Sequence, residues 1–365
     1  MNFVRALVQT VRTASPPRRP GATLRSAAAL ADAGLLEGDR LAAADEAAAL
    51  LPVAITPHLA ALIDPDDPGD PIARQFVPDA RELDTADEEL ADPIGDSAHA
   101  PLTGIVHRYP DRVLLTPLMA CPVYCRFCFR REAVGMGALT PAQMAAALGY
   151  IRDRAEIREV ILSGGDPLAL SPRRMKALIA ALDEIDHVET VRIHSRVPVA
   201  DPARVTPAMV AALKAETPVW LAIHCNHPRE LTAEARAAAR ALADGGIPLL
   251  AQTVLLKGVN DDAATLESLM RALVRNRIKP YYLHHGDRAR GTAHFRTTLD
   301  TGRALMRSLR GRLSGIAQPA YVLDIPGGHG KVPVGPEYLS RDGDGCWTVE
   351  DWQGGRHRYA ETIGG

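Results

Sequence analysis

Lysine is scarce in this sequence. The 365 residues include 42 lysines and arginines together, and only five of these are lysine. The five are Lys176, Lys214, Lys257, Lys279 and Lys331. Chemistry that needs a lysine amine, such as imine formation with an aldehyde cofactor, therefore has few candidate residues.

Several other features are missing. No uninterrupted apolar run is long enough to span a bilayer, and no apolar segment has the form of a secretory signal. A net charge of −2 argues against a protein that coats nucleic acid. Five cysteines, three of them clustered, fit a reducing compartment better than a disulfide scaffold. We therefore expect a cytoplasmic protein that binds neither membrane nor nucleic acid.

The N-terminal 31 residues contain five arginines and no acidic residue. This composition is typical of an organelle transit segment, but a mobile bacterial N-terminus has it too, and we favour the second interpretation. From residue 22 to residue 62 the chain is rich in Ala and Leu, which predicts helices. A connector rich in Pro and Asp follows, from residue 63 to residue 101.

Beyond the connector, short apolar runs of strand type alternate with segments of helical period. Helices are predicted at 140–155 and 171–185, for example. The expected strands are 112–120, 159–166, 188–196, 218–225, 247–256, 279–287 and 319–328. Repeated strand–helix units predict a parallel sheet, and polar residues gathered at the strand ends favour a barrel. We therefore predict a partial (β/α)6 TIM-like barrel over 101–335, with an N-terminal helical region and connector over 1–100 and a short C-terminal extension over 336–365.

Three cysteines lie within eight residues in "CPVYCRFC", directly after the first predicted strand. The spacing of Cys121, Cys125 and Cys128 lets a short loop wrap around one metal site. A structural zinc would need a fourth ligand, which Cys225 or His224 could supply. A four-iron cluster with one open iron is the other interpretation, and the spacing alone leaves both open.

Glycine-rich turns follow two other predicted strands. In "LSGGDP", Gly164 and Gly165 would let the backbone approach a ligand closely, although a simple tight turn has the same pattern. In "DIPGGHGKVP", Lys331 has the setting expected for contact with a cofactor. Lys257, after another strand, is a second candidate for imine formation.

Charged residues complete the pattern. Arg108 and Arg112 in "HRYPDRV" can bind phosphate, although surface ion pairing with Asp111 would also explain them and is the favoured interpretation of this stretch taken by itself. Asp287 and Asp324 each lie at the end of a predicted strand. Three roles are open to them: general acid–base catalysis, binding of a cation, or simple capping of a helix or turn.

The combination of these motifs resembles the radical S-adenosylmethionine superfamily. Within it, the chain is similar to the lysine 2,3-aminomutase family from about residue 103 to residue 340. The stretches that carry the resemblance include "GIVHRYPDRVLL", "CPVYCRFCFRR", "ILSGGDPL", "PVWLAIHCNHP", "QTVLLKGVND" and "VLDIPGGHGKVP".

The resemblance implies three cofactors and a role for each candidate residue. It implies that a [4Fe–4S] cluster is bound by Cys121, Cys125 and Cys128. It implies that S-adenosylmethionine is bound by Ser163, Gly164, Gly165, Asp166, Arg196, His224 and Gln252. It also implies that the catalytic Lys331 binds pyridoxal 5′-phosphate, with Arg112 on the phosphate and Arg108 and Tyr109 nearby. It implies that Arg130 binds the substrate α-carboxylate, and that Asp287 and Asp324 receive a lysine ε-ammonium.

The implied reaction is conversion of L-lysine to β-lysine (3,6-diaminohexanoate) by an isomerase, with a one-electron reductant such as flavodoxin or ferredoxin and a homo-oligomeric assembly. Relatives that act on glutamate replace the two acids. Phe127 and His284 stand where lysine-degrading members usually have histidine and tyrosine, and the His284 stretch resembles the branch that makes β-lysine for elongation factor P. The alternatives are therefore that branch, an aminomutase for another cationic amino acid such as arginine, and a non-catalytic zinc-binding barrel. The sequence gives Arg126 and Arg131 no role beyond charge at the surface or around the site.

Overall fold

The computed structural model describes residues 21–341 and 346–361. Its largest element is a nine-stranded sheet whose strands lie in chain order. The seven strands from β2 to β8 are parallel, and β1 and β9 pair antiparallel at the two edges. The strands are β1 (Ile105–Tyr109), β2 (Arg112–Leu118), β3 (Glu159–Gly164), β4 (Thr190–Ser195), β5 (Val219–His224), β6 (Leu249–Val254), β7 (Ile278–His284), β8 (Ala320–Asp324) and β9 (Lys331–Pro333).

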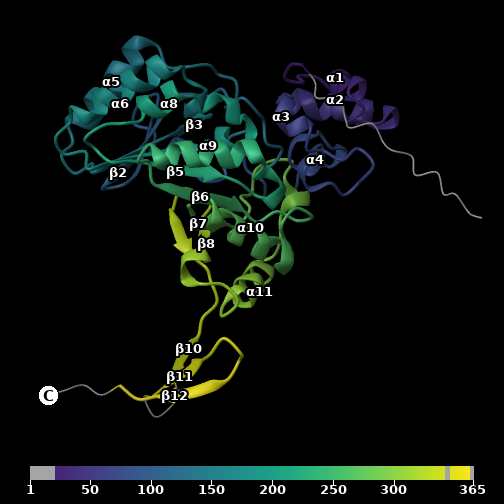
Figure 1. Ribbon diagram of the computed structural model, residues 1–365, viewed down its shortest axis with the longest axis vertical. Helices are drawn as coiled ribbons and strands as arrows, with labels where there is room; N and C mark the ends of the chain where they lie inside the picture. The colour runs from purple at the N-terminus through teal and green to yellow at the C-terminus, as the bar shows by residue number, and fades with distance from the viewer. Residues whose placement is uncertain (1–20, 342–345, 362–365) are drawn as a thin grey trace, which may run out of the picture.

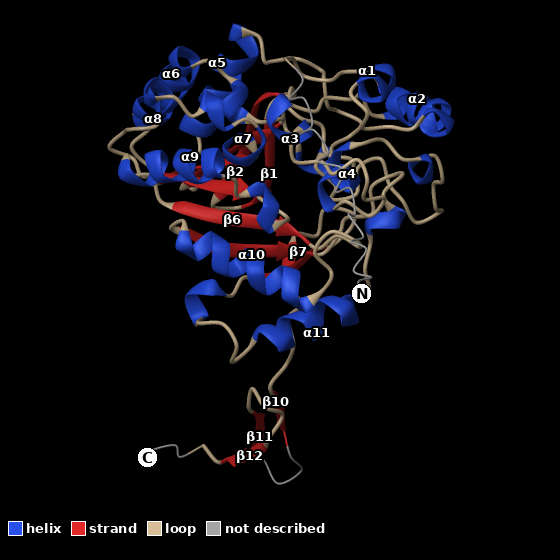
Figure 2. Cartoon of the chain, turned by 45° about the vertical axis from the view of Figure 1, so that its right-hand side comes forward, coloured by secondary structure: helices blue, strands red, loops and turns tan. Residues whose placement is uncertain are grey.

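Helices follow the parallel strands and cover one face of the sheet (Figures 1 and 2). They are α5 (Pro141–Arg152), α6 (Pro172–Asp183), α7 (Val197–Ala200), α8 (Pro207–Ala212), α9 (Ala233–Asp244), α10 (Ala263–Arg275) and α11 (Leu299–Leu309). The sequence starts α5, α6 and α8 in the same way, with a Thr or Ser N-cap followed by Pro. The cap side chain satisfies a free backbone N–H, and each such cap stabilises the helix by about 1 kcal/mol.

The main core lies between these helices and the sheet. Central strands such as β3 bury four consecutive residues, because helices cover one face while the other face lines the interior of the curled sheet. The seven expected strands correspond to the seven parallel strands β2 to β8, and the predicted partial barrel is confirmed. The antiparallel edge strands β1 and β9 were not predicted, because each is short and lies next to a turn.

The N-terminal region packs as a separate cluster of helices. It contains α1 (Ala27–Asp32), α2 (Leu41–Leu50), α3 (Pro57–Ala60) and α4 (Pro71–Phe76), on the side away from α5 and α6 (Figure 2). Its apolar core includes Val123 of the cysteine loop and Ala200 after β4. The region therefore sits against loops that leave the carboxyl ends of the strands.

The C-terminal residues form a small antiparallel sheet that projects from the barrel (Figure 1). Its strands are β10 (Leu339–Arg341), β11 (Trp347–Glu350) and β12 (Arg356–Tyr359). The division into three regions at residues 100 and 335 remains a proposal. The arginine-rich segment falls mostly on residues 1–20, which lie outside the described residues. No helix within 21–341 or 346–361 has the length and apolar character needed to cross a membrane.

Candidate active site

One large cavity occupies the interior of the curled sheet and the carboxyl ends of its strands. Its volume is about 1060 Å³. Every site residue that the family resemblance implied lines it, namely Arg108, Tyr109, Arg112, Cys121, Cys125, Cys128, Arg130, Ser163, Gly164, Gly165, Asp166, Arg196, His224, Gln252, Asp287, Asp324 and Lys331. Since these residues come from all parts of the sheet, the fold gathers them in the place where barrel enzymes carry their active sites.

The three cysteines lie on the loop between β2 and α5. Burial raises the pKa of the Cys121 and Cys125 thiols, and raises that of Cys128 to about 11. A metal would therefore have to displace their protons on binding. Within the described ranges, no three His, Cys, Asp or Glu side chains are grouped to hold a single metal ion. An iron–sulfur cluster holds each thiolate on a different iron, and three cysteines on one short loop supply a donor set of that kind.

Cys225 does not support the zinc alternative. It belongs to the main apolar core rather than to the cavity lining, and its thiol donates to the carbonyl of His227 at 3.6 Å. His224 does line the cavity, and its Nε2 is buried with no hydrogen-bond partner. Burial holds the pKa of His224 well below its usual range, so the ring is neutral and is available to a ligand.

The two glycines after β3 serve the packing of the cysteine loop. A Cβ on Gly165 would lie 2.3 Å from the carbonyl oxygen of Ala120, and one on Gly164 would lie 2.9 Å from that of Leu118. Gly164 also has a φ of +99°, which favours glycine. A side chain at either position would therefore meet the residues that precede Cys121. The expectation that these glycines admit a ligand to the backbone stays a prediction.

Asp166 links the loops that follow β3 and β4. Its carboxylate accepts from the Ser195 hydroxyl at 2.7 Å and from the backbone N–H groups of Arg196, Val197 and Leu168. The side chain is buried, so these bonds join the turn after β3 to the loop after β4 at the cavity wall.

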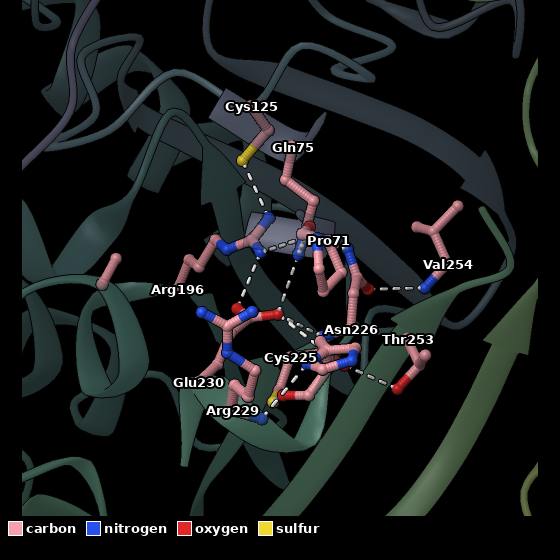
Figure 3. A network of polar contacts seen from close by, with 12 residues as sticks. Pro71, Gln75, Cys125, Arg196, Cys225, Asn226, Arg229, Glu230, Thr253 and Val254 are labelled. Carbon is pink, nitrogen blue, oxygen red and sulfur yellow. Dashed lines mark hydrogen bonds and ion pairs between the residues drawn. The ribbon is translucent and has the colours of Figure 1, made fainter. Parts of the chain in front are cut away.

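Arg196 is held from several sides (Figure 3). One Nη donates to the Cys125 sulfur at 3.0 Å, and the other donates to Gln75 at 2.6 Å and to Glu230 at 2.7 Å. Gln75 and Glu230 were not predicted, because Gln75 lies in the connector and Glu230 lies just beyond the stretch "PVWLAIHCNHP". Gln252 of β6 lies 2.9 Å from the Nε2 of His194 of β4. His194 is another cavity residue that the sequence did not single out.

Lys331 lies at the start of β9, opposite Asp324 at the end of β8. Its ammonium forms an ion pair with that carboxylate and lies 3.3 Å from the Nδ1 of His284. Burial acts to raise the pKa of Asp324, but the neighbouring His284 and Lys331 outweigh it and lower that pKa to about 2. Burial and the nearby Asp324 charge raise the pKa of Asp287 to about 7. This end of the cavity therefore carries two carboxylates for one lysine.

Two arginines converge on Asp96, which the sequence analysis placed in the connector without a role. Arg108 donates to one carboxylate oxygen at 3.0 Å, and Arg130 donates to the other at 2.7 Å. Arg130 also donates to the Ser163 hydroxyl at 3.1 Å. Two guanidinium groups with one carboxylate leave this end of the cavity with one net positive charge.

Arg112 and Tyr109 lie near Lys331. Arg112 forms the ion pair with Asp111 at 2.6 Å that the sequence allowed, and it stacks on the Tyr109 ring at 3.8 Å. The Tyr109 hydroxyl accepts from the backbone N–H of Lys331 at 2.7 Å. The nearby Arg192 makes a bidentate contact with Glu159 inside the sheet, and sequence reasoning missed both residues.

Two family models match this chain. The model of the radical SAM superfamily matches residues 115–269, and a model described as lysine-2,3-aminomutase matches residues 306–362. The L-lysine 2,3-aminomutase of Clostridium subterminale is 44% identical over 86% of this chain and 76% of its own length. A putative L-lysine 2,3-aminomutase of Aquifex aeolicus is 44% identical over 82% of each chain. The chain belongs to the lysine 2,3-aminomutase family.

This family also includes an enzyme with a different name. The glutamate 2,3-aminomutase of Clostridioides difficile is 39% identical over 82% of this chain and 72% of its own length. Identity alone therefore separates the two activities weakly, and the substrate has to be argued from the site. Membership of the radical SAM superfamily implies a [4Fe–4S] cluster and S-adenosylmethionine, with chemistry of the aminomutase type.

The two departures from the lysine-degrading members both lie at the cavity. Phe127 packs edge-on against the rings of His224 and Phe295, with centroids 5.7 and 6.0 Å away. His284 lies beside Lys331 and Asp324, and burial and the Lys331 charge lower its pKa, so the ring is neutral. Each replacement is accommodated by the packing around it.

Of the two roles that the sequence left to Arg126 and Arg131, charge at the surface or around the site, the surface role is excluded because both side chains are buried. Each donates to Glu82 of the connector, at 2.7 Å from Arg126 and 2.8 Å from Arg131. Arg126 also donates to the carbonyl groups of Leu51 and Ala47. In this family member, the arginines beside the three cysteines therefore attach the cysteine loop to the N-terminal region.

Proposed function

We propose that this protein converts L-lysine to β-lysine by 1,2-amino migration, with a [4Fe–4S] cluster, S-adenosylmethionine and pyridoxal 5′-phosphate. Asp324 carries the proposal, because its carboxylate already binds a primary ammonium, that of Lys331. With Lys331 holding pyridoxal phosphate, this carboxylate and Asp287 would face the cavity without their cation. The side-chain ammonium of a lysine substrate supplies one.

The charges along the cavity fit the rest of such a substrate. The end at Arg108, Arg130 and Asp96 has one net positive charge, which suits one α-carboxylate. The end at Asp287 and Asp324 suits one ammonium, because a cation taken from water needs compensating charge. A glutamate side chain would place a third carboxylate beside these two. The charge pattern therefore favours lysine over glutamate.

Each cofactor has a proposed set of residues. Cys121, Cys125 and Cys128 would hold the cluster, and the walls at Ser163–Asp166, Arg196, His224 and Gln252 would hold S-adenosylmethionine. Lys331 would bind pyridoxal phosphate, with Arg112 on the phosphate and Arg108 and Tyr109 nearby. When bound, these groups supply a carbon radical and a ring that delocalises the unpaired electron during nitrogen migration. The chain itself supplies position, charge and exclusion of water.

The product formed from lysine tests the proposal. Protein reconstituted anaerobically with iron, sulfide and both organic cofactors, and reduced by flavodoxin, ferredoxin or a chemical one-electron donor, is incubated separately with lysine, arginine and glutamate. Chromatography is expected to show β-lysine from lysine and no product from glutamate. Absence of β-lysine would refute the proposal, and a product from arginine alone would favour the related activity on another cationic amino acid.

Iron and zinc analysis of the same preparation addresses the non-catalytic alternative. We expect about four irons per chain and a brown colour. A colourless protein with one zinc would overturn the radical chemistry. The cytoplasmic location and the homo-oligomeric state stay as predictions.

A further inference from the structure

The side chains around Arg196 form a buried polar network beside the cysteine loop (Figure 3). Four parts of the chain meet in it: α4 through Gln75, the cysteine loop through Cys125, the end of β4 through Arg196, and the turn after β5 through Glu230. Arg196 and Glu230 are almost fully buried charges. Burial of an unpaired charge destabilises the folded state, so charges buried this deeply are expected to have a role of their own.

Only Cys125 of the three cysteines has its sulfur bonded to an arginine within the part of the chain that the structure describes. The Arg196 Nη1 lies 3.0 Å from this sulfur. The guanidinium lies over the ring of Phe76, 4.6 Å from its centroid, and that of Phe127 is 5.4 Å away. These rings keep water away from the contact, which strengthens its electrostatic effect.

The other side of Arg196 is fixed as firmly. Its Nη2 donates to Gln75 at 2.6 Å and to Glu230 at 2.7 Å. The second Glu230 oxygen accepts from the backbone N–H groups of Asn226 at 3.0 Å and His227 at 2.9 Å. Glu230 therefore cannot rotate away without leaving these groups unsatisfied, and Arg196 is held in one orientation toward the sulfur.

We infer that Arg196 is a positioning residue that acts on the iron–sulfur cluster through the Cys125 sulfur and raises its reduction potential, and that Glu230 balances this effect. The inference rests on the proposed function, because it takes Cys125 as a cluster ligand. One-electron reduction adds a negative charge to the cluster. A hydrogen-bond donor with a positive charge at a ligand sulfur stabilises the reduced form, and a nearby buried carboxylate opposes it.

This mechanism predicts opposite shifts for two neutralising substitutions. Arg196→Gln removes the donor and the positive charge, so the potential is expected to become more negative. Glu230→Gln leaves the guanidinium without its counter-charge, so the potential is expected to become more positive. A residue that only held the loop in shape would not produce shifts of opposite sign, because both substitutions would loosen the same contacts.

The test is an anaerobic redox titration of the reconstituted protein, followed by electron paramagnetic resonance, without S-adenosylmethionine or lysine. Arg192→Gln is the matched control: it removes another buried arginine of β4, paired with Glu159 rather than with a cysteine, and should leave the potential unchanged. Arg196→Lys keeps the charge but loses the forked geometry, and its shift should be smaller than that of Arg196→Gln. It also keeps the test valid if Arg196→Gln does not load iron.

Iron and sulfide content is measured first for every variant. If the unsubstituted protein binds no four-iron cluster, the proposed function fails and the inference fails with it. If it binds the cluster, and the Arg196 and Glu230 variants that load iron titrate at the unsubstituted potential or shift in the same direction, the inference alone is wrong.

Discussion

Lys331 and Asp324 form an ion pair across the antiparallel β8–β9 register, inside the cavity. The pair joins the residue proposed to bind pyridoxal phosphate to one of the two carboxylates proposed to bind the substrate. The same carboxylate can therefore hold the lysine of the protein before the cofactor binds and the lysine of the substrate afterwards. The first prediction concerns this lysine.

Lys331→Ala is expected to abolish covalent attachment of pyridoxal phosphate, because the other lysines do not line the cavity. Protein treated with pyridoxal phosphate and borohydride is digested, and the labelled peptide is identified by mass spectrometry. Lys257→Ala is the control and should keep the label on Lys331, since Lys257 is exposed. Iron content should not change in either variant. A label on Lys257 in the unsubstituted protein would refute the assignment.

Asp287 should make stability depend on pH. Its pKa is about 7 in the folded protein, against an ordinary value of 3.8. The folded state therefore keeps a proton that the unfolded state has lost, and the free energy of unfolding falls as pH rises between these two values. Urea denaturation of the cofactor-free protein at about pH 5 and about pH 8 measures the slope.

Asp287→Asn should remove this part of the slope and make the protein relatively more stable at the higher pH. Asp300→Asn is the control, because Asp300 is exposed in the first turn of α11. Equal slopes for the Asp287 variant and the unsubstituted protein would show that the carboxyl group titrates normally.

Asp96→Asn should weaken lysine binding by misplacing Arg130. The substitution removes the charge that both Arg130 and Arg108 contact, and a loss of about 1.4 kcal/mol corresponds to a tenfold rise in KM. Because Asp96 acts through Arg130, kcat should fall less than KM rises. Asp201→Asn, which removes the half-buried partner of the exposed Arg204, should keep the unsubstituted KM. A normal KM for the Asp96 variant would mean that Arg130 needs no positioning.

Gly165→Ala should destabilise the protein by about 1–3 kcal/mol, the usual cost of overpacking. The new Cβ would lie 2.3 Å from the Ala120 carbonyl oxygen, next to Cys121, so iron loading should fall too. Gly149→Ala is the matched control. It lies in α5 with no atom near its added Cβ, and should stabilise the protein by about 0.5–1 kcal/mol. Thermal unfolding and iron analysis compare the two, and equal melting temperatures would contradict the packing argument.

The sequence was informative where local pattern and fold agree. The parallel strands appear as short apolar runs, and their polar ends mark the catalytic face, so seven strands and the cavity position could be predicted. The cysteine spacing and the scarcity of lysine left few candidate residues for binding a metal or for forming an imine. Short edge strands such as β9 have no such pattern, because three residues show no periodicity.

The acids and amides that hold the arginines could not be predicted. Glu82 pairs with Arg126 across 44 residues, and Gln75 bonds Arg196 across 121 residues. Nothing in the local sequence distinguishes these side chains from exposed ones, since the connector contains many carboxylates. Their roles depend on where the N-terminal region packs against the barrel.

The sequence by itself thus determined the order of the seven parallel strands, the cysteine loop and the single lysine in a glycine-rich turn, because these follow from local pattern and spacing. Only the tertiary structure decided that Asp96 holds Arg108 and Arg130, that Lys331 faces Asp324, and that Arg196 reaches the Cys125 sulfur. The physical reason is that a buried charge pairs with the groups that lie near it in space, and the packing of distant segments determines which groups those are.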